Sequence, residues 1–311
     1  MSIAEIQASP EQPGVDETLP RRRWRVVWWS AVAGFLLTVL WSARFVDSVI
    51  GDTVANSLLG HDAENTAISG IGAGVLFAFI SGLAGTFTAC NIAVFGTMAP
   101  MLGRAPTGWD RTRATLRPLL WLSVGMVAVS ALYGVLVGLV GTSMPQFASG
   151  PRTPGVVPGY LVQSMVVFGL IGLSMLYLGL AALRIVPDPF AERPTARMVF
   201  LGALVGGFLI GRPFPLFRHM FVDAAERGDP LYGAGAFVLQ SLGNIVVMAV
   251  LLALVAGVFG GRLARWLSRT PSRASTVTAA GLVAAGVFTV LYWDVRLLAF
   301  MDLIWYPALW R

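Results

Sequence analysis

The feature that most constrains this chain is a series of seven apolar segments, each long enough to cross the ~30 Å hydrocarbon core of a bilayer. Only 12% of the residues are charged, about half of the ~25% that is typical of soluble domains. So much apolar surface cannot face water. The sequence therefore predicts an all-α integral membrane protein with about seven transmembrane helices. The first segment lies within residues 21–46, and the others lie near 68–102, 118–141, 159–186, 198–222, 234–259 and 275–293.

The two ends of the chain differ from the apolar segments. Residues 1–20 are polar and include three prolines, which predicts a disordered cytoplasmic tail. Residues 294–311 are rich in aromatic side chains and are expected to lie on the outer face, either along the membrane interface or as a frayed end anchored by tryptophan. The predicted divisions are the tail 1–20, an N-terminal transmembrane helix 21–46, a six-helix membrane domain 68–293 and an aromatic tail 294–311.

Arginine placement predicts the orientation in the membrane. With seven spans, fifteen arginines fall on one side and five on the other. Basic residues concentrate on the cytoplasmic side of membrane proteins, so we expect a multi-pass protein of a bacterial plasma membrane, with its N-terminus in the cytoplasm and its C-terminus outside. The fifteen are Arg21, Arg22, Arg23, Arg25, Arg104, Arg111, Arg113, Arg117, Arg184, Arg193, Arg197, Arg262, Arg265, Arg269 and Arg273.

Charge distribution and cysteine content exclude several classes of function. The net charge of +6 is spread over short loops and does not line one face, so nucleic acid is not an expected partner. The single cysteine, Cys90, cannot form an intramolecular disulfide or a cysteine-based zinc site. His61 and His219 are far apart in sequence, so neither a metal site nor a cofactor is expected. Whether the chain is an enzyme stays open.

The second to fourth and fifth to seventh apolar segments resemble two copies of one unit. Each copy begins with a glycine-rich segment that a distinctive motif interrupts, GTFTACN at residues 85–91 and GRPFPLFR at 211–218. A unit of three spans has an odd number of crossings, so its second copy must be inverted in the membrane. The predicted architecture is an extra N-terminal helix followed by an inverted repeat of three plus three helices.

The order of these motifs resembles the CcdA family, transmembrane electron carriers related to the membrane domain of DsbD. The stretch from Gly82 to Cys90 is similar to the first cysteine helix of that family. The stretch from Gly206 to Gly243 is similar to the second, with Pro213-Phe214 where the family has Pro-Cys. The resemblance covers residues 68–293 and implies a divergent member that lacks the second cysteine.

The resemblance implies a role in thiol–disulfide exchange and cytochrome c biogenesis. In that chemistry one thiolate attacks a disulfide and a second thiol resolves the mixed disulfide. Cys90 matches the nucleophile, whereas Phe214 occupies the position of the resolving cysteine. Cys90 would therefore be catalytic only with a thiol from another protein, such as a thioredoxin-like partner, and would otherwise be an inert buried side chain. The alternatives are a transporter of small solutes or ions on the same scaffold, or a non-catalytic subunit of a membrane complex.

Polar residues inside the apolar segments are candidates for a substrate path or polar cavity. An arginine at the centre of a membrane helix costs at least ~2.5–3.5 kcal/mol, so Arg212 is a candidate by default, with snorkelling to the headgroups as the alternative. The prolines beside it would free backbone groups. Gln240 and Asn244 are four residues apart and share one helix face, where they could bind a substrate or form interhelical hydrogen bonds. The candidates are Arg212, Pro213, Pro215, Asn91, Gln240 and Asn244.

Overall fold

The chain forms a bundle of long apolar helices. The computed structural model describes residues 19–42, 52–60, 62, 68, 70–84, 108–147, 155–211, 215–270 and 272–308, and every regular element in these ranges is helical. Five helices there are long and apolar enough to cross a bilayer. The structure is thus that of a multi-pass membrane protein. The five candidate spans are Leu116–Ser143, Gly159–Ala182, Pro194–Gly211, Pro230–Phe259 and Arg273–Phe300.

The five candidate spans coincide with five of the seven predicted segments. The segments predicted at 21–46 and 68–102 contain α1 and α3, which are not among the five. The all-helical class is therefore confirmed, and the count of seven spans stays a prediction. The elements in chain order are α1 (Arg23–Leu40), α2 (Asp52–Leu59), α3 (Gly70–Ala84), α5 (Gly108–Val140), η3 (Gly141–Ser143), η4 (Pro145–Phe147), α6 (Gly159–Ala182), α7 (Pro194–Gly211), α8 (Pro215–Arg227), α9 (Pro230–Ser268), α10 (Arg273–Val290), the π-helical turn η5 (Leu291–Val295) and α11 (Arg296–Phe300).

The apolar segment predicted at 198–222 forms parts of two helices. Helix α7 ends at Gly211 and α8 begins at Pro215. Proline has no backbone N–H and a fixed φ, which suits the first turn of a helix. Helix α8 also carries acidic and basic residues, so it does not continue the apolar span.

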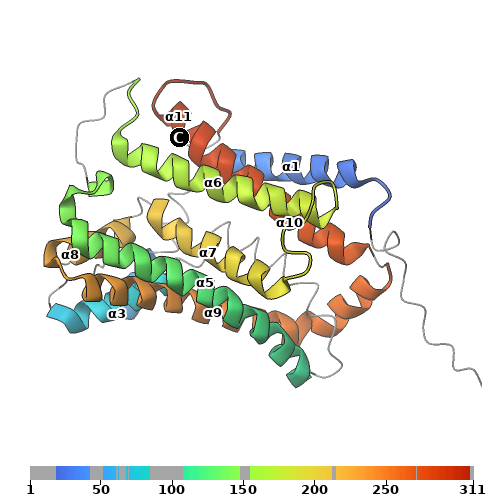
Figure 1. The fold of residues 1–311 in the computed structure, drawn as a ribbon, viewed down its shortest axis with the longest axis horizontal. Helices are drawn as coiled ribbons and strands as arrows, with labels where there is room; N and C mark the ends of the chain where they lie inside the picture. Colours follow the sequence, from blue (N-terminus) through green and yellow to red (C-terminus); the bar gives the residue numbers. More distant parts are fainter. Residues whose placement is uncertain are drawn as a thin grey trace, which may run out of the picture.

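Neighbouring helices in the bundle are mostly not neighbours in the chain. Figure 1 shows α3, α5 and α9 on one side, α1, α6 and α10 on the other, and α7 between the two groups. Helix α9 packs between α3 and α5, α7 packs on α5 and α6, and α10 packs between α6 and α1. Helices α3 and α9 run in one direction, and α5 and α7 run together in the opposite direction.

Glycines allow several helix pairs to cross with their backbones in contact, and the pairs α3 with α9 and α5 with α7 are two of them. Between α3 and α9, a Cβ at Gly82 would overlap the carbonyl group of Gln240, and a Cβ at Gly243 would overlap the carbonyl oxygen of Phe79. Small residues permit such close approach of membrane helices, where packing replaces the hydrophobic effect as the attractive force. The α3–α9 crossing therefore requires glycine on both helices.

Helices α5 and α7 cross in the same manner. A Cβ at Gly202 would overlap the carbonyl group of Leu122, and a Cβ at Gly125 would overlap the carbonyl oxygen of Val199. The spacing is the same in both crossings. Phe79 precedes Gly82 by three residues, and Gln240 precedes Gly243 by three. Likewise Leu122 precedes Gly125 by three residues, and Val199 precedes Gly202 by three.

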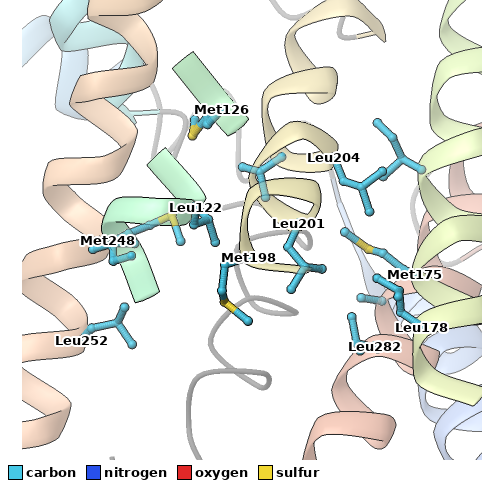
Figure 2. Packing of buried hydrophobic residues seen from close by; sticks show 14 of the residues in the cluster. Leu122, Met126, Met175, Leu178, Met198, Leu201, Leu204, Met248, Leu252 and Leu282 are labelled. Atoms are coloured by element: carbon cyan, nitrogen blue, oxygen red, sulfur yellow. The ribbon is translucent and has the colours of Figure 1, made fainter. Parts of the chain in front are cut away.

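Leucine and methionine side chains fill the space around α7. Figure 2 shows this cluster, to which α5, α6, α7, α9 and α10 contribute. Leu122, Met175, Leu201 and Met248 are among its fully buried members. The outward faces are equally apolar, and Leu132, for example, is 67% exposed. An apolar exterior of this kind matches a lipid environment.

The C-terminal residues hold the end of α1. Arg296 is only 3% exposed, and its Nη1 donates hydrogen bonds to the carbonyl oxygens of Thr38 and Trp41, both at 2.8 Å. The hydroxyls of Thr38 and Tyr306 are hydrogen-bonded to each other. In this way Arg296 satisfies carbonyl groups that the end of a helix leaves without intrahelical partners. Within the predicted tail 294–311, Arg296 and Tyr306 thus contact α1.

Replacing Gly202 by alanine tests the glycine crossings. We expect Gly202→Ala to lower stability by roughly 1–3 kcal/mol, because its Cβ forces α5 and α7 apart. Gly235→Ala in α9 is the matched control, since a Cβ there meets open space, and it is expected to be neutral or to stabilise by up to ~1 kcal/mol. Thermal unfolding of the purified protein in detergent measures both. Equal melting temperatures for the two variants would contradict the crossing.

Candidate functional site

Four buried polar side chains lie at the level where α3, α5 and α9 cross. Gln240 and Ser241 of α9 are 2% and 1% exposed, Ser130 of α5 is 0% exposed, and Ser81 of α3 is 1% exposed. Ser130 is near the middle of its candidate span, Leu116–Ser143, and Gln240 is about a third of the way along its own, Pro230–Phe259. We call these four residues the mid-membrane cluster. Polar groups at this depth have no bulk water and need partners in the protein or in a ligand.

The glycine crossing positions this cluster. Because Gly82 has no side chain, the backbone of α3 lies directly against the carbonyl group of Gln240. Ser81 is adjacent to Gly82, and Ser241 is adjacent to Gln240. The cluster is therefore a consequence of the packing of α3 and α9.

The three serines of the cluster have hydrogen-bond partners. The hydroxyls of Ser130 and Ser241 are 2.5 Å apart, joining α5 to α9. The hydroxyl of Ser81 donates to the carbonyl oxygen of Ala78 at 2.8 Å within α3. These bonds satisfy the serines without any ligand.

Gln240 is different. Its Oε1 is buried and has no hydrogen-bond partner among the residues that the structure describes. A buried acceptor without a partner costs roughly 1–3 kcal/mol, and such groups in native proteins call for an explanation such as a bound water or ligand. Asn244, one turn further along α9, is half-buried. The amide of Gln240 is thus a candidate for binding a solute inside the membrane.

A second polar group lies at the C-terminal end of α7. Nε2 of Gln163 in α6 donates to the carbonyl oxygen of Ile210 at 3.0 Å and lies 3.1 Å from the hydroxyl of Tyr133. That hydroxyl in turn donates to Oε1 of Gln146. Because α7 ends at Gly211, the carbonyl of Ile210 has no partner within its helix. Gln163 therefore caps α7 from a neighbouring helix.

A small cavity adjoins this group of residues. Its volume is about 20 Å³, and Gln146, Gln163 and Arg218 are among the residues that line it. That is enough for one water molecule. Nε2 of Gln146 is buried without a hydrogen-bond partner among the described residues, and a water in the cavity would satisfy it. The sequence analysis missed this group, although the backbone groups that it expected Pro213 and Pro215 to free must find partners on some side chain.

The structure places only part of the predicted site. Cys90, Asn91, Arg212 and Pro213 lie outside the described residues. Pro215 is the first residue of α8, and Gln240 and Asn244 both lie in α9. Gln240 thus lies at the same level of the bundle as three serines that were not predicted. The functional roles of all these candidates remain predictions.

Asp223 organises the turn between α8 and α9. Its carboxylate accepts hydrogen bonds from Nε of Arg227 at 3.0 Å and from the hydroxyl of Tyr232 at 2.5 Å. The hydrogen bond to Asp223 raises the pKa of Arg227 above its ordinary value. The guanidinium also lies 4.5 Å from the centre of the Tyr232 ring. These contacts fix the turn, so we assign Asp223 a structural role.

No family model, curated protein or solved structure matches this chain. The class that the fold and site define is a multi-pass helical membrane protein with buried polar groups inside its spans. Any narrower assignment depends on the sequence resemblance and on the geometry described above.

Two glutamine substitutions are expected to have different effects on stability. Gln163→Leu removes the cap of Ile210 and the contact to Tyr133, so it should destabilise the protein by roughly 1–3 kcal/mol. Gln240→Leu removes an acceptor that lacks a partner among the described residues, so without a ligand it should be neutral or stabilising. Thermal unfolding in detergent compares the two variants, and a larger loss for Gln240→Leu would show that this side chain has a structural partner.

Proposed function

We propose that this chain is a divergent CcdA-like protein of a bacterial plasma membrane and that its mid-membrane cluster binds a small polar solute during transport. The proposal includes seven spans, with the N-terminus in the cytoplasm and the C-terminus outside. The observation that carries it is the buried Oε1 of Gln240, which has no partner among the described residues.

The two glycine crossings support the inverted repeat in this proposal. In the repeat, α3, α5 and α6 correspond to α7, α9 and α10. The crossing of α3 with α9 then corresponds to the crossing of α7 with α5. Gly82 and Gly243 occupy in the first crossing the places that Gly202 and Gly125 occupy in the second. The first pair of helices runs opposite to the second, as inversion requires.

The position of Gln240 between the two proposed repeat units supports a transport function. In proteins built from inverted repeats, substrate sites lie near the bilayer midplane at the interface between repeats. Gln240 belongs to α9 and packs on α3, so in the proposed repeat it lies between the two units. A polar solute loses water molecules when it enters the membrane, and the side-chain amide of Gln240 would compensate by forming a hydrogen bond with it.

Thiol–disulfide exchange, with a role in cytochrome c biogenesis, is the second candidate. The observation that favours it is that Cys90 follows the end of α3 at Ala84 by only six residues, close in sequence to the polar cluster. The Cys90 thiolate would attack the disulfide of a thioredoxin-like protein, releasing one of its sulfurs as a thiolate. A thiol of another protein would then displace Cys90, since the chain has no second cysteine. This dependence on an external thiol is why we rank transport first.

Solute uptake by proteoliposomes tests the transport function. Purified full-length protein is reconstituted and presented with radiolabelled amino acids, or with divalent cations and an enclosed metal-sensitive dye. These probes represent the small solutes and ions that are the expected substrates of a transporter on this scaffold. We expect Gln240→Leu to reduce uptake roughly tenfold, the effect of losing one hydrogen bond of ~1.4 kcal/mol to the solute. Ser143→Ala is the control, because Ser143 is exposed and, among the described residues, bonds only to the nearby carbonyl of Val140.

The cysteine separates the two functions. Transport predicts that Cys90→Ser keeps full uptake. Exchange predicts that Cys90→Ser is inactive in cells and that Cys90 displaces thionitrobenzoate from a thioredoxin-like protein whose one remaining cysteine carries that group, which leaves a trapped mixed disulfide. If Gln240→Leu and Asn244→Leu keep full flux, the transport proposal fails. Tolerance of all these changes, together with a co-purifying protein, would identify a non-catalytic subunit of a membrane complex.

A further inference from the structure

Asp294 is the only acidic residue in the five candidate spans that the structure describes, and neither function discussed above uses it. The sequence assigns it to the predicted outer tail, but the helical span that begins at Arg273 continues past it to Phe300. Acidic residues are rare inside membrane spans and by default mark sites of function, among them sites that carry protons.

The backbone at Asp294 departs from the regular α-helix. Asp294 belongs to the π-helical turn η5, which joins α10 to α11. Single π-helical turns inside α-helices are rare and are frequently found at functional sites. The turn η5 packs on α6 and α1, the same two helices that flank α10 in Figure 1. The acid is thus carried by a turn that two other helices contact.

The carboxylate of Asp294 lies directly against the backbone of α6. A Cβ at Gly169 would be 3.3 Å from both Oδ1 and Oδ2 of Asp294. Gly169 is near the middle of the candidate span Gly159–Ala182. The adjacent side chain, Phe168, is fully buried and stacks on Trp293 with 4.2 Å between the ring centres. The acid is therefore held beside the apolar core of the bundle and away from the ends of α6.

This carboxylate has no compensating positive charge among the described residues. Its Oδ2 is buried without a hydrogen-bond partner among them, and the ion pairs that they form involve other acids. The nearest arginine in sequence, Arg296, instead donates to the carbonyl oxygens of Thr38 and Trp41. An ionised carboxylate without a partner is far more costly in apolar surroundings than the neutral acid. The position therefore suits a protonated carboxyl.

The elements around Asp294 bring no second acid to it. Within α1, α6, α10, η5 and α11, the other charged or titratable residues are tyrosines and arginines. The tyrosines of α6 are at least eight positions from Gly169. Three of the arginines lie in the first turns of α1 and α10, whereas η5 follows the end of α10. The remaining arginine lies 4.9 Å from the centre of the Tyr292 ring. The full set is Tyr160, Tyr177, Tyr292, Arg23, Arg25, Arg273 and Arg296.

We propose that Asp294 binds and releases a proton inside the membrane and that this proton moves together with the transported solute. The carboxyl is neutral while it is packed against Gly169. When α6 and α10 separate there and water enters, the carboxyl transfers its proton to a water molecule, which leaves a carboxylate and a hydronium ion. The reverse transfer restores the packed state. The coupling to a solute rests on the proposed transport function, whereas the proton site itself does not.

Infrared spectroscopy of the full-length protein in detergent tests the proton site. A protonated carboxyl has a C=O stretching band that disappears when the acid is ionised. At about pH 6 exposed carboxyls are ionised, because their pKa values are near 4. We expect the wild type to keep such a band at this pH and to lose it reversibly at alkaline pH. Asp294→Asn should lack the band, while Asp302→Asn, at an exposed acid of the same segment, should retain it.

Two infrared results would overturn the proton site. One is a spectrum of Asp294→Asn that is identical to that of the wild type, and the other is a band that persists at every pH. Asparagine has nearly the same shape as the neutral acid, so Asp294→Asn is expected to fold. Asparagine also tolerates the left-handed backbone of Asp302, whose φ is 58°. Melting temperatures of both variants check that each is folded.

Proteoliposomes test the coupling of the proton to transport. An inward proton gradient is expected to stimulate uptake several-fold in the wild type and in Asp302→Asn. Asp294→Asn should lose this stimulation, because an amide cannot release a proton in this way, whereas Gln240→Leu should lower uptake with and without the gradient. Stimulation that persists in Asp294→Asn would overturn the coupling and leave the transport function standing. Absence of uptake by the wild type would overturn both, and the infrared band would still decide the proton site.

Discussion

Close approach of helix backbones at glycine is the constraint on which the rest of this structure depends. Lipid is as apolar as the leucine side chains of the helices, so the hydrophobic effect does not draw the helices together in a bilayer. Direct packing must do so, and the paired glycines of α3 with α9 and of α5 with α7 permit it. The same contacts bring Gln240 against α3 and place α5 beside α7. A side chain at any of these glycines would shift both the bundle and its polar cluster.

Long-range capping is the second principle of this fold. Two helix ends are completed by side chains that come from elsewhere in the chain, the end of α7 by Gln163 and the end of α1 by Arg296. Inside a membrane, a backbone carbonyl without a partner is costly because no bulk water can replace it. The polar side chains at these positions thus hold the tertiary structure together. Gln240 is a candidate for ligand binding because its buried Oε1 caps no helix end in the described residues and has no partner among them.

The positions of the helices could be predicted because apolar runs are a local property of the sequence. The segments predicted at 118–141, 159–186, 234–259 and 275–293 all lie within or across long helices. Gln240 and Asn244 could also be identified, since an amide within an apolar run is conspicuous. Gln163 is equally polar but was missed, because its role depends on the carbonyl of Ile210 in another helix. Arg296 could be seen only as one more charge on the expected outer side.

The sequence by itself determined that the chain is helical, multi-pass and apolar on its outside, because the length and hydropathy of each segment are properties of consecutive residues. Only the tertiary structure decided which helices touch, which glycines are indispensable and which polar groups find partners. These depend on contacts between residues far apart in the chain, such as Gly82 with Gln240 or Arg296 with Thr38. A residue's type states what bonds it can form, and the packing of the helices decides whether it forms them.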